Sequence, residues 1–449
     1  MEKHTTCLQS KILCFSLFYL LSVVYLSLSS SKCTLRPPSA SPPPFSYPPS
    51  YGENKHAIPT TRSSCNSPVF FSDYSVVLKK MEANLMNSTI FGERSLRYMQ
   101  GNGESFGGNL SLKERLSHFD QSDYGNEIPC GFFKPFKISY SDRTTMEKCN
   151  GVVVVTAIFN DHDKIRQPRN LGPKTSDRVC FFVFVDDATI KGLYLYNVIS
   201  SQTKENKIGV WSIVRVSGEG LYKNPAMNGV IPKHLVHRLF PNTKYSVWVD
   251  AKLQLTNDPL LLIDALIVGP GVDMALSRHP YFVHTIEEAM ATARWKKWRH
   301  VDELRMQMET YCENGLQPWH SNKSYPTDVP DTALILRKHG AASNQFSCLL
   351  FNELEAFNHR DQLAFTFVRD KITPKIIINM FEVEVFEQIA IEYRHKHNLK
   401  NYACTRVTYR RFRFMNRRFT VQEMLEPEPA RLPPGGSGSE NIYLYNNYG

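Results

Sequence analysis

The strongest chemical pattern in the chain is an acid, followed two residues later by a lysine, directly after an apolar run. Residues 245–249 read YSVWV and lead into Asp250, Ala251 and Lys252. A carboxylate at a strand end can hold Mg²⁺ or Mn²⁺, because both ions prefer hard oxygen ligands. A protonated lysine cannot ligate a metal, but it can neutralise a diphosphate as a point charge. We therefore predict a phosphate-binding site, either with a metal at Asp250 or metal-independent; a plain turn cap at Asp250 is the alternative.

Other polar residues follow apolar runs in the same way. Asp186 and Asp187 come directly after CFFVFV, where they could contact a nucleoside base or ribose, or simply form an Asx turn. His279 follows the apolar residues 274–277. It is predicted to act on the acceptor side of a reaction, and a solvent-facing loop histidine is the alternative.

A second dense polar cluster covers residues 352–362 and precedes the apolar run LAFTFV. Acid and amide side chains of this kind bind sugar hydroxyls and can supply a general base. Asp361 and Gln362 are therefore predicted catalytic residues. The alternative for Asp361 is a helix cap, stabilised by the positive end of the helix dipole.

These side chains need a scaffold that brings strand ends together. Short, apolar and β-branched runs predict buried strands, at 152–159, 180–185, 211–216 and 245–249, with a fifth candidate at 274–277. Helical spacing occurs at 232–240, and 285–311 is predicted as one long helix. Alternating strands and helices indicate an α/β domain with a mostly parallel sheet flanked by helices. Such sheets bind ligands at the carboxyl ends of their strands, where the predicted acids stand.

The N-terminal residues 12–31 carry no charge and are mostly apolar. About 20 helical residues of this kind span the bilayer core of roughly 30 Å, and Lys3 and Lys11 favour a cytoplasmic N-terminus. We predict an uncleaved type II signal-anchor, with a cleaved signal peptide as the alternative. Both interpretations place the rest of the chain in a lumen.

Composition divides the chain into six predicted segments. They are a cytoplasmic tail at 1–11, a transmembrane anchor at 12–31, a Pro-rich stem at 32–75, a stem or pre-domain region at 76–128, a single lumenal catalytic domain at 129–400, and a basic, then Pro/Gly-rich tail at 401–449. An anchor, a stem and a globular domain form the layout of a Golgi-resident enzyme.

Sequons and cysteines agree with a lumenal, oxidising compartment. Three sequons predict N-glycosylation, at Asn87, Asn109 and Asn322. Cys130 and Cys149 are close enough in sequence to pair, whereas Cys180 and Cys348 lie in apolar runs and could be buried free thiols. The chain contains no CxxC pair, so a zinc site is not expected.

The formal net charge is +10, from 53 Lys and Arg against 43 Asp and Glu. Much of this excess lies in residues 394–418, which contain no acid, so the predicted domain is close to neutral. Hydrophobic residues make up 42% of the chain, which excludes wholesale disorder. A lumenal placement excludes nucleic acid as a partner. The basic segment is predicted to touch pectin-like polyanions or anionic lipid, or to be merely solvated.

Long blocks of sequence carry a resemblance to a plant protein family. The blocks read CNGVVVVTAIFNDHDKIRQP, NPAMNGVIPKHLVHRLFPN, WVDAKLQL, EEAMATARWKKW, YPTDVPDTALILRKH and NELEAFNHRDQLAF. Over residues 130–399 the chain resembles the family named for a turgor-regulation-defect protein and a mucilage-related hexosyltransferase. The strand that runs into Asp250 also resembles the way GT-A glycosyltransferases present a DxD motif, with Lys252 in place of the second acid.

This resemblance implies a GT-A-like, Rossmann-like fold, a nucleotide-sugar donor and, in many such enzymes, Mn²⁺ or Mg²⁺. One branch of the family implies a Golgi hexosyltransferase of cell-wall polysaccharide synthesis, with a glycan acceptor and the Golgi membrane as partners. The other branch implies an alkaline ceramidase, which hydrolyses the amide of a sphingolipid. The residues favour the hexosyltransferase. The ceramidase is the alternative, and a non-catalytic glycan-binding module is the third hypothesis.

Overall fold

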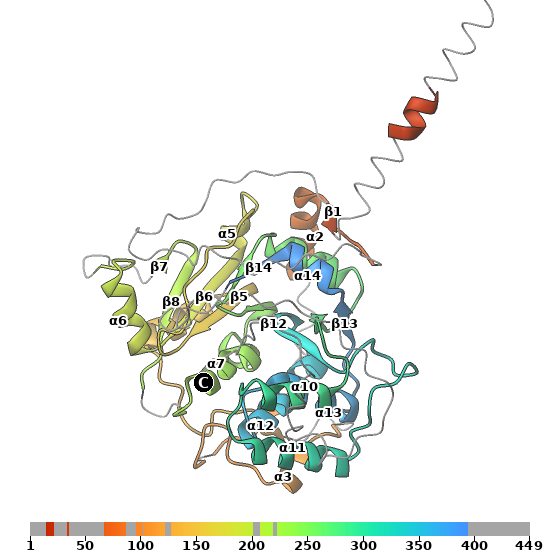
Figure 1. Cartoon of the computed structure of the whole chain (residues 1–449). Helices are drawn as coiled ribbons and strands as arrows, with labels where there is room; N and C mark the ends of the chain where they lie inside the picture. The colour runs from red at the N-terminus through yellow and green to blue at the C-terminus, as the bar shows by residue number, and fades with distance from the viewer. Residues whose placement is uncertain are drawn as a thin grey trace, which may run out of the picture.

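The structure is a computed structural model that describes residues 15–21, 34–35, 67–86, 96–101, 103–121, 127–200, 207–218 and 222–393. Its largest element is an eight-stranded sheet in the order β13-β11-β12-β9-β5-β6-β8-β7 (Figure 1). The strands are β5 (Gly151–Ile158), β6 (Val179–Val185), β7 (Lys207–Ile208), β8 (Trp211–Arg215), β9 (Thr243–Val249), β11 (Met274–Arg278), β12 (Pro330–Lys338) and β13 (Ile378–Phe381). The large sheet with its helices confirms the predicted mixed α/β fold.

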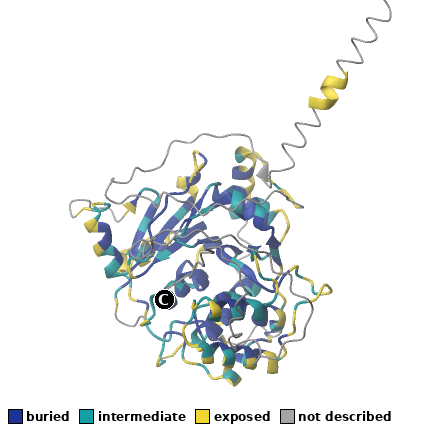
Figure 2. Ribbon diagram, viewed as in Figure 1, coloured by how far each residue is buried: buried dark blue, intermediate teal, exposed yellow. Residues whose placement is uncertain are grey.

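Helices cover both faces of this sheet, and Figure 2 shows its strands as buried. In β5, Val152 and Val154 belong to one apolar cluster, while Val153 and Val155 belong to another. An uninterrupted apolar strand is expected where both faces of a sheet are covered.

The helices that contribute side chains to one apolar cluster are α4 (Tyr140–Glu147), α7 (Pro225–His234), α8 (Val236–Leu239), α10 (Thr285–Arg294), α11 (Val301–Glu313), α12 (Ala341–Ala356) and α13 (Asp361–Lys371), and α3 (Leu112–Ser117) packs against this cluster. Figure 1 shows α7, α10, α11, α12 and α13 in the same part of the molecule. The other cluster contains side chains of α2 (Tyr74–Met86), α6 (Asp187–Leu195), α9 (Pro259–Ile263), the π-helix η3 (Asp264–Val268) and α14 (Val383–Ile389). The short helix α5 (Thr175–Arg178) precedes β6.

The strand directions decide which residues meet at the edges of the sheet. β12 is antiparallel to both of its neighbours, β9 and β11, while β5, β6, β8, β9, β11 and β13 all point the same way. The beginning of β12 therefore lies at the edge where β9 and β11 end. The chain also switches sides at β5, with β6 on one side and β9 on the other. Open α/β sheets bind ligands outside the carboxyl ends of strands at such a point.

Three two-stranded sheets accompany the large one. They pair β1 (Thr34–Leu35) with β2 (Val69–Phe70), β3 (Arg97–Tyr98) with β4 (Glu127–Ile128), and β10 (Leu253–Leu255) with β14 (Ala390–Glu392). The third pair is antiparallel, with Leu253 opposite Glu392, and it adjoins the end of β9.

The prediction of one long helix over 285–311 is wrong. α10 ends at Arg294, and α11 begins at Val301. Between them Lys296 has a left-handed φ of 51°, which a continuous helix does not allow. The region 76–128, predicted as stem or pre-domain, contributes the buried side chains Val77, Met81 and Phe106 to the two apolar clusters.

The predicted ends of the chain are described only in part. Of the predicted anchor at 12–31, residues 15–21 are described, and they are helical. No helix within the described ranges is both long and apolar enough to cross a bilayer. The basic segment 394–418 and the sequon at Asn87 lie outside the described residues, whereas Asn109 and Asn322 are exposed.

The described residues contain two disulfides, and neither matches the predicted state of the cysteines. Cys130 pairs with Cys348, and Cys149 pairs with Cys180. The pairing of Cys130 with Cys149 is therefore wrong, as are the free thiols at Cys180 and Cys348. Cys149 precedes β5, and Cys180 lies in the neighbouring β6, so this bridge ties two central strands together. Cys312 is a free, exposed cysteine.

We expect replacement of both Cys149 and Cys180 by serine to lower the free energy of unfolding by about 2–5 kcal/mol, because the cross-link restricts the unfolded chain. Denaturant unfolding without reductant measures the change. The matched control is Cys312→Ser, which should change stability by less than about 0.5 kcal/mol. Equal unfolding midpoints for the double variant and the wild type would contradict the assigned bridge.

Candidate functional site

The edge where β9 and β11 end brings together residues that are distant in sequence. Asp250 follows β9, and its backbone N–H donates to the Ala333 carbonyl of β12 at 2.8 Å. His279 follows β11, and Asp331 is the second residue of β12. The antiparallel course of β12 is the reason that Asp331 faces this edge. Asp250 and His279, both predicted as site residues, therefore belong to one region of the molecule.

Lys233 of α7 connects two of the predicted residues. Its Nζ lies 2.7 Å from Asp361 Oδ2 and 3.7 Å from Asp250 Oδ1. The other Asp361 oxygen accepts a hydrogen bond from Thr332 Oγ1 at 2.7 Å. Asp250 Oδ1 also accepts from the indole N–H of Trp248 at 2.7 Å. Lys233 of α7 thus holds together the carboxylate of Asp361, at the start of α13, and that of Asp250, after β9.

Asp361 is a buried, ionised partner of this lysine rather than an accessible base. Burial alone would raise the pKa of Asp361, but Lys233 and His234 hold that pKa well below its usual range. The His234 ring lies 3.3 Å from Asp361 Oδ2, and burial lowers the pKa of His234 to about 4. Asp361 is only 4% exposed. Asp361 therefore orients Lys233 in the fold. Gln362, the next residue of α13, is half-buried.

Lys252 lies among acidic groups. Its Nζ is 2.8 Å from Glu392 Oε1, and its backbone carbonyl accepts from the Tyr393 N–H at 2.8 Å. Burial alone would lower the pKa of Lys252, but Glu392, Asp331 and Asp250 raise it. Burial raises the pKa of Asp331 to about 6, against the opposing effect of Lys252. Lys252 therefore stays protonated, as the cation of a three-carboxylate cluster.

These residues do not fit a divalent metal. Mg²⁺ and Mn²⁺ need several oxygen ligands around one point, free of competing cations. Here the ammonium groups of Lys233 and Lys252 already pair with the acids that would serve as ligands. Over the described part of the chain, the three carboxylates of Asp250, Asp331 and Glu392 do not form a group of ligand atoms within 4.8 Å of one another.

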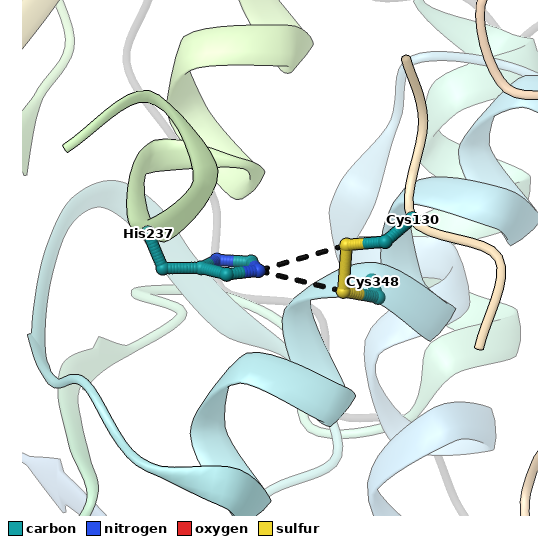
Figure 3. Close-up of side chains that lie close together, drawn as sticks. All are labelled: Cys130, His237 and Cys348. Carbon is teal, nitrogen blue, oxygen red and sulfur yellow. Dashed lines mark hydrogen bonds between the residues drawn. A yellow bond between two sulfur atoms is a disulfide. The ribbon is translucent and has the colours of Figure 1, made fainter. Parts of the chain in front are cut away.

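The one group of described residues that meets this distance is Cys130, His237 and Cys348. Figure 3 shows the two sulfurs joined in a disulfide, with His237 Nε2 at 3.6 Å from Cys130 Sγ and 3.4 Å from Cys348 Sγ. A disulfide offers no thiolate to a metal.

A second charged cluster adjoins His279. Glu288 of α10 is fully buried, and its Oε1 accepts from Arg360 at 2.5 Å and lies 3.7 Å from Lys297 Nζ. The His279 ring lies 3.7 Å from the other Glu288 oxygen, and burial lowers the pKa of His279 to about 4. Burial also lowers the pKa of Lys297 to about 8, with Lys252 among the cations that act on it. Lys297 and Arg360 keep about a fifth of their side chains exposed, so both can meet a ligand.

A hollow of about 240 Å³ lies outside the ends of β5, β6 and β8, and its lining is Asn160, Asp186, Asp187, Ala188, Gly218, Tyr222, Lys223, Pro225 and Asn228. Asp186 caps α6 by accepting from the Thr189 N–H at 2.9 Å, and it also accepts from the Asn160 N–H at 2.7 Å. Asp187 pairs with Arg215 at 2.6 Å, and this bond holds the pKa of Asp187 below its usual value. The two predicted acids therefore shape one wall of a polar pocket.

Sequence reasoning missed several residues of this edge. Lys233 is a charged residue inside a mostly apolar helix, and this contrast is the one feature of the sequence that could have marked it as a site residue. Glu392 reaches Lys252 only through the pairing of β14 with β10, which no local pattern announces. Lys297 belongs to a charged run that the sequence cannot distinguish from a solvated helix face, whereas Arg360 lies inside the predicted polar cluster 352–362.

Comparisons with known proteins point to one family. A family model described as TOD1/MUCI70, glycosyltransferase-like domain, matches residues 89–395. The chain is 60% identical over 402 residues to a protein of Arabidopsis thaliana named alkaline ceramidase TOD1, covering 87% of this chain and 86% of that protein. It is 33% identical over 348 residues to the probable hexosyltransferase MUCI70 of the same plant, covering 74% of this chain and 58% of that protein.

The apo structure of mouse xyloside xylosyltransferase 1 aligns with 52% of this chain and 84% of its own, at 8% identity. Its TM-score is 0.29, which is too low to carry an argument about fold or chemistry.

We expect Asp361→Asn to lower the free energy of unfolding by about 3–5 kcal/mol, because it leaves Lys233 buried without a full counter-charge. This difference in the free energy of unfolding between the wild type and Asp361→Asn should be present at neutral pH. Since the pKa of Asp361 is lower in the folded than in the unfolded state, the difference should shrink as the pH falls below about 4. Asp302→Asn, at an exposed position of α11, is the control and should cost less than about 1 kcal/mol. Equal losses from both variants would rule out a buried ion pair.

Proposed function

We propose that this chain, which belongs to the TOD1/MUCI70 family of glycosyltransferase-like domains, transfers a hexose from a nucleotide sugar to a glycan. The observation that carries the proposal is the layout of one sheet edge. A polar pocket lies outside β5, β6 and β8, and a charged cluster lies outside β9 and β11, where Lys252, Lys297 and Arg360 pair with acids and stay partly exposed. A nucleoside diphosphate with an attached sugar needs these two parts, in this order, along a GT-A-like sheet.

The nucleoside would occupy the pocket beside Asp186, Asp187 and Tyr222. The diphosphate would extend towards the next strand ends, where Lys252, Lys297 and Arg360 offer positive charge. Fixed cations that face the leaving diphosphate stabilise the charge that develops in the transition state. Nucleotide-sugar transferases often add a divalent metal at this position, which supplies the same charge stabilisation. The acids here do not fit such an ion, because Lys233 and Lys252 already pair with them.

The acceptor would approach from the β11 side. Asp331 carries a carboxyl pKa of about 6, which suits a group that takes a proton near neutral pH. His279 lies on this side and stacks on Phe282, with ring centroids 5.0 Å apart. Asp361 positions Lys233 and does not touch the acceptor, and Gln362 is the neighbouring polar group.

The predicted placement in the cell belongs to the same proposal. An anchor at 12–31 would hold the domain on the lumenal side of the Golgi membrane as a type II protein, where cell-wall glycans are acceptors. The two disulfides and the exposed sequons at Asn109 and Asn322 support an oxidising lumen. N-glycans at these two positions would face solvent.

Hydrolysis of ceramide is the second candidate, since it is the activity in the name of a 60% identical relative. Amide hydrolysis needs an activated water or a nucleophile with a neighbouring base. Residues 103–107 read GESFG, which fits the pattern GxSxG that carries the serine of many hydrolases. In the structure this segment is an irregular loop instead of a strand-to-helix turn, and Ser105 Oγ accepts from the Gly108 N–H at 2.9 Å. The loop therefore lacks the geometry of a nucleophile elbow.

We expect Asp250→Asn to reduce nucleotide-sugar turnover on the order of 10²-fold, because it removes the carboxylate that orients Lys233 and accepts from the Trp248 indole at the sheet edge. The measurement is product formation from a panel of nucleotide sugars with wall glycans as acceptors. Asp177→Asn, at an exposed position of α5, is the control and should retain wild-type turnover. Unchanged turnover in a folded Asp250→Asn protein would contradict the proposed site. Fatty-acid release from ceramide by the same preparation, with no sugar transfer, would favour the amidase instead.

A further inference from the structure

We propose that Lys252 is a built-in cation that takes the place of a divalent metal at this site, so that a nucleoside diphosphate binds without any metal ion. The inference deepens the proposed function and rests on it for the identity of the ligand. The exclusion of a metal by Lys252 does not depend on the proposed function, because it is argued only from the carboxylates around this lysine.

Three elements deliver the acids that surround Lys252. Asp250 comes from the end of β9, Asp331 from the start of β12, and Glu392 from β14. Glu392 makes the direct contact, at 2.8 Å from Nζ, and the other two acids act on Lys252 through their charge. In a DxD site, two acids of one short segment share a divalent ion. Here the second of those two positions is Lys252, and its ammonium group pairs with the acids in place of a metal ion.

The backbone around Lys252 is fixed, so the ammonium stays in the cluster. The Lys252 carbonyl accepts from the Tyr393 N–H, and the preceding Ala251 carbonyl accepts from the Arg166 guanidinium. That guanidinium also lies over the Tyr393 ring, 4.6 Å from its centroid. Tyr393 in turn donates from its hydroxyl to Gln254 at 3.0 Å. The side chain of Lys252 nevertheless remains 24% exposed, so a ligand at the sheet edge can reach it.

The charge balance makes the inference testable. Lys252 is one positive charge among three acids, and its removal leaves an acid cluster in which Asp250 keeps only a 3.7 Å contact with Lys233, a lysine that Asp361 already holds at 2.7 Å. A second acid at position 252 would restore an Asp-x-Asp pair beside Asp331 and Glu392. Hard oxygen ligands suit Mn²⁺, and the three wild-type carboxylates, which do not meet within 4.8 Å, would gain the missing ligand at position 252. Lys252→Asp should therefore turn a metal-free site into a metal site.

The experiment measures Mn²⁺ binding to the purified full chain by calorimetry and by the electron paramagnetic resonance of free Mn²⁺. We expect no binding to the wild type at low millimolar Mn²⁺. Lys252→Asp should bind one Mn²⁺ at least 10-fold more tightly than the wild type. Lys148→Asp makes the same charge change at an exposed position beside α4 and should behave like the wild type. Failure of a folded Lys252→Asp protein to gain Mn²⁺ binding, or tight binding by the wild type, would overturn the inference.

A second readout uses UDP and GDP as probes, with EDTA or with Mn²⁺. The wild type should bind one of them equally well in both buffers. Lys252→Asp should lose at least 10-fold in affinity in EDTA and recover it with Mn²⁺, and Lys252→Arg should keep metal-free binding. If wild-type binding requires Mn²⁺, the inference is wrong while the proposed function stands. If neither probe binds in any buffer, the proposed function fails, and the Mn²⁺ measurement alone decides the role of Lys252.

Discussion

The ion pair between Lys233 and Asp361 is the interaction on which the geometry of the site depends. It joins α7 to the start of α13, and through Thr332 and Asp250 it joins both helices to β12 and β9. Buried charges are tolerated only when they are paired and hydrogen-bonded, so this contact fixes the relative position of the helical layer and the sheet edge. Asp250, two residues before Lys252, contacts the same lysine at 3.7 Å.

The antiparallel course of β12 is the second constraint. Because β12 runs against β9 and β11, its first residues meet the last residues of both neighbours. Asp331 thereby joins Asp250 and His279 at one edge, although some 50 to 80 residues separate it from them in sequence. The small sheet of β10 and β14 adds Glu392 to the same edge. The result is a charge cluster built from four separate segments of the chain.

The sequence predicts the buried strands well, because runs such as VVVVTAIF have no other stable location than a covered sheet. It also predicts correctly that Asp186 and Asp187 follow one strand and Asp250 another. It does not predict contacts that depend on topology, such as Glu392 with Lys252 or Cys130 with Cys348. It also cannot tell whether Asp361 faces a ligand or a buried lysine, since a polar residue before a helix is compatible with both.

The central claim is that a nucleoside diphosphate binds along this edge, with a lysine where related enzymes often use a metal. A crystal structure of the full chain with a bound nucleoside diphosphate tests it most directly. The account predicts the nucleoside against Asp186, Asp187 and Tyr222, and a phosphate oxygen within hydrogen-bond distance of Lys252 Nζ, with no metal ion between them. A nucleotide bound elsewhere, or a metal ion coordinated by Asp250 with Lys252 turned away, would contradict it.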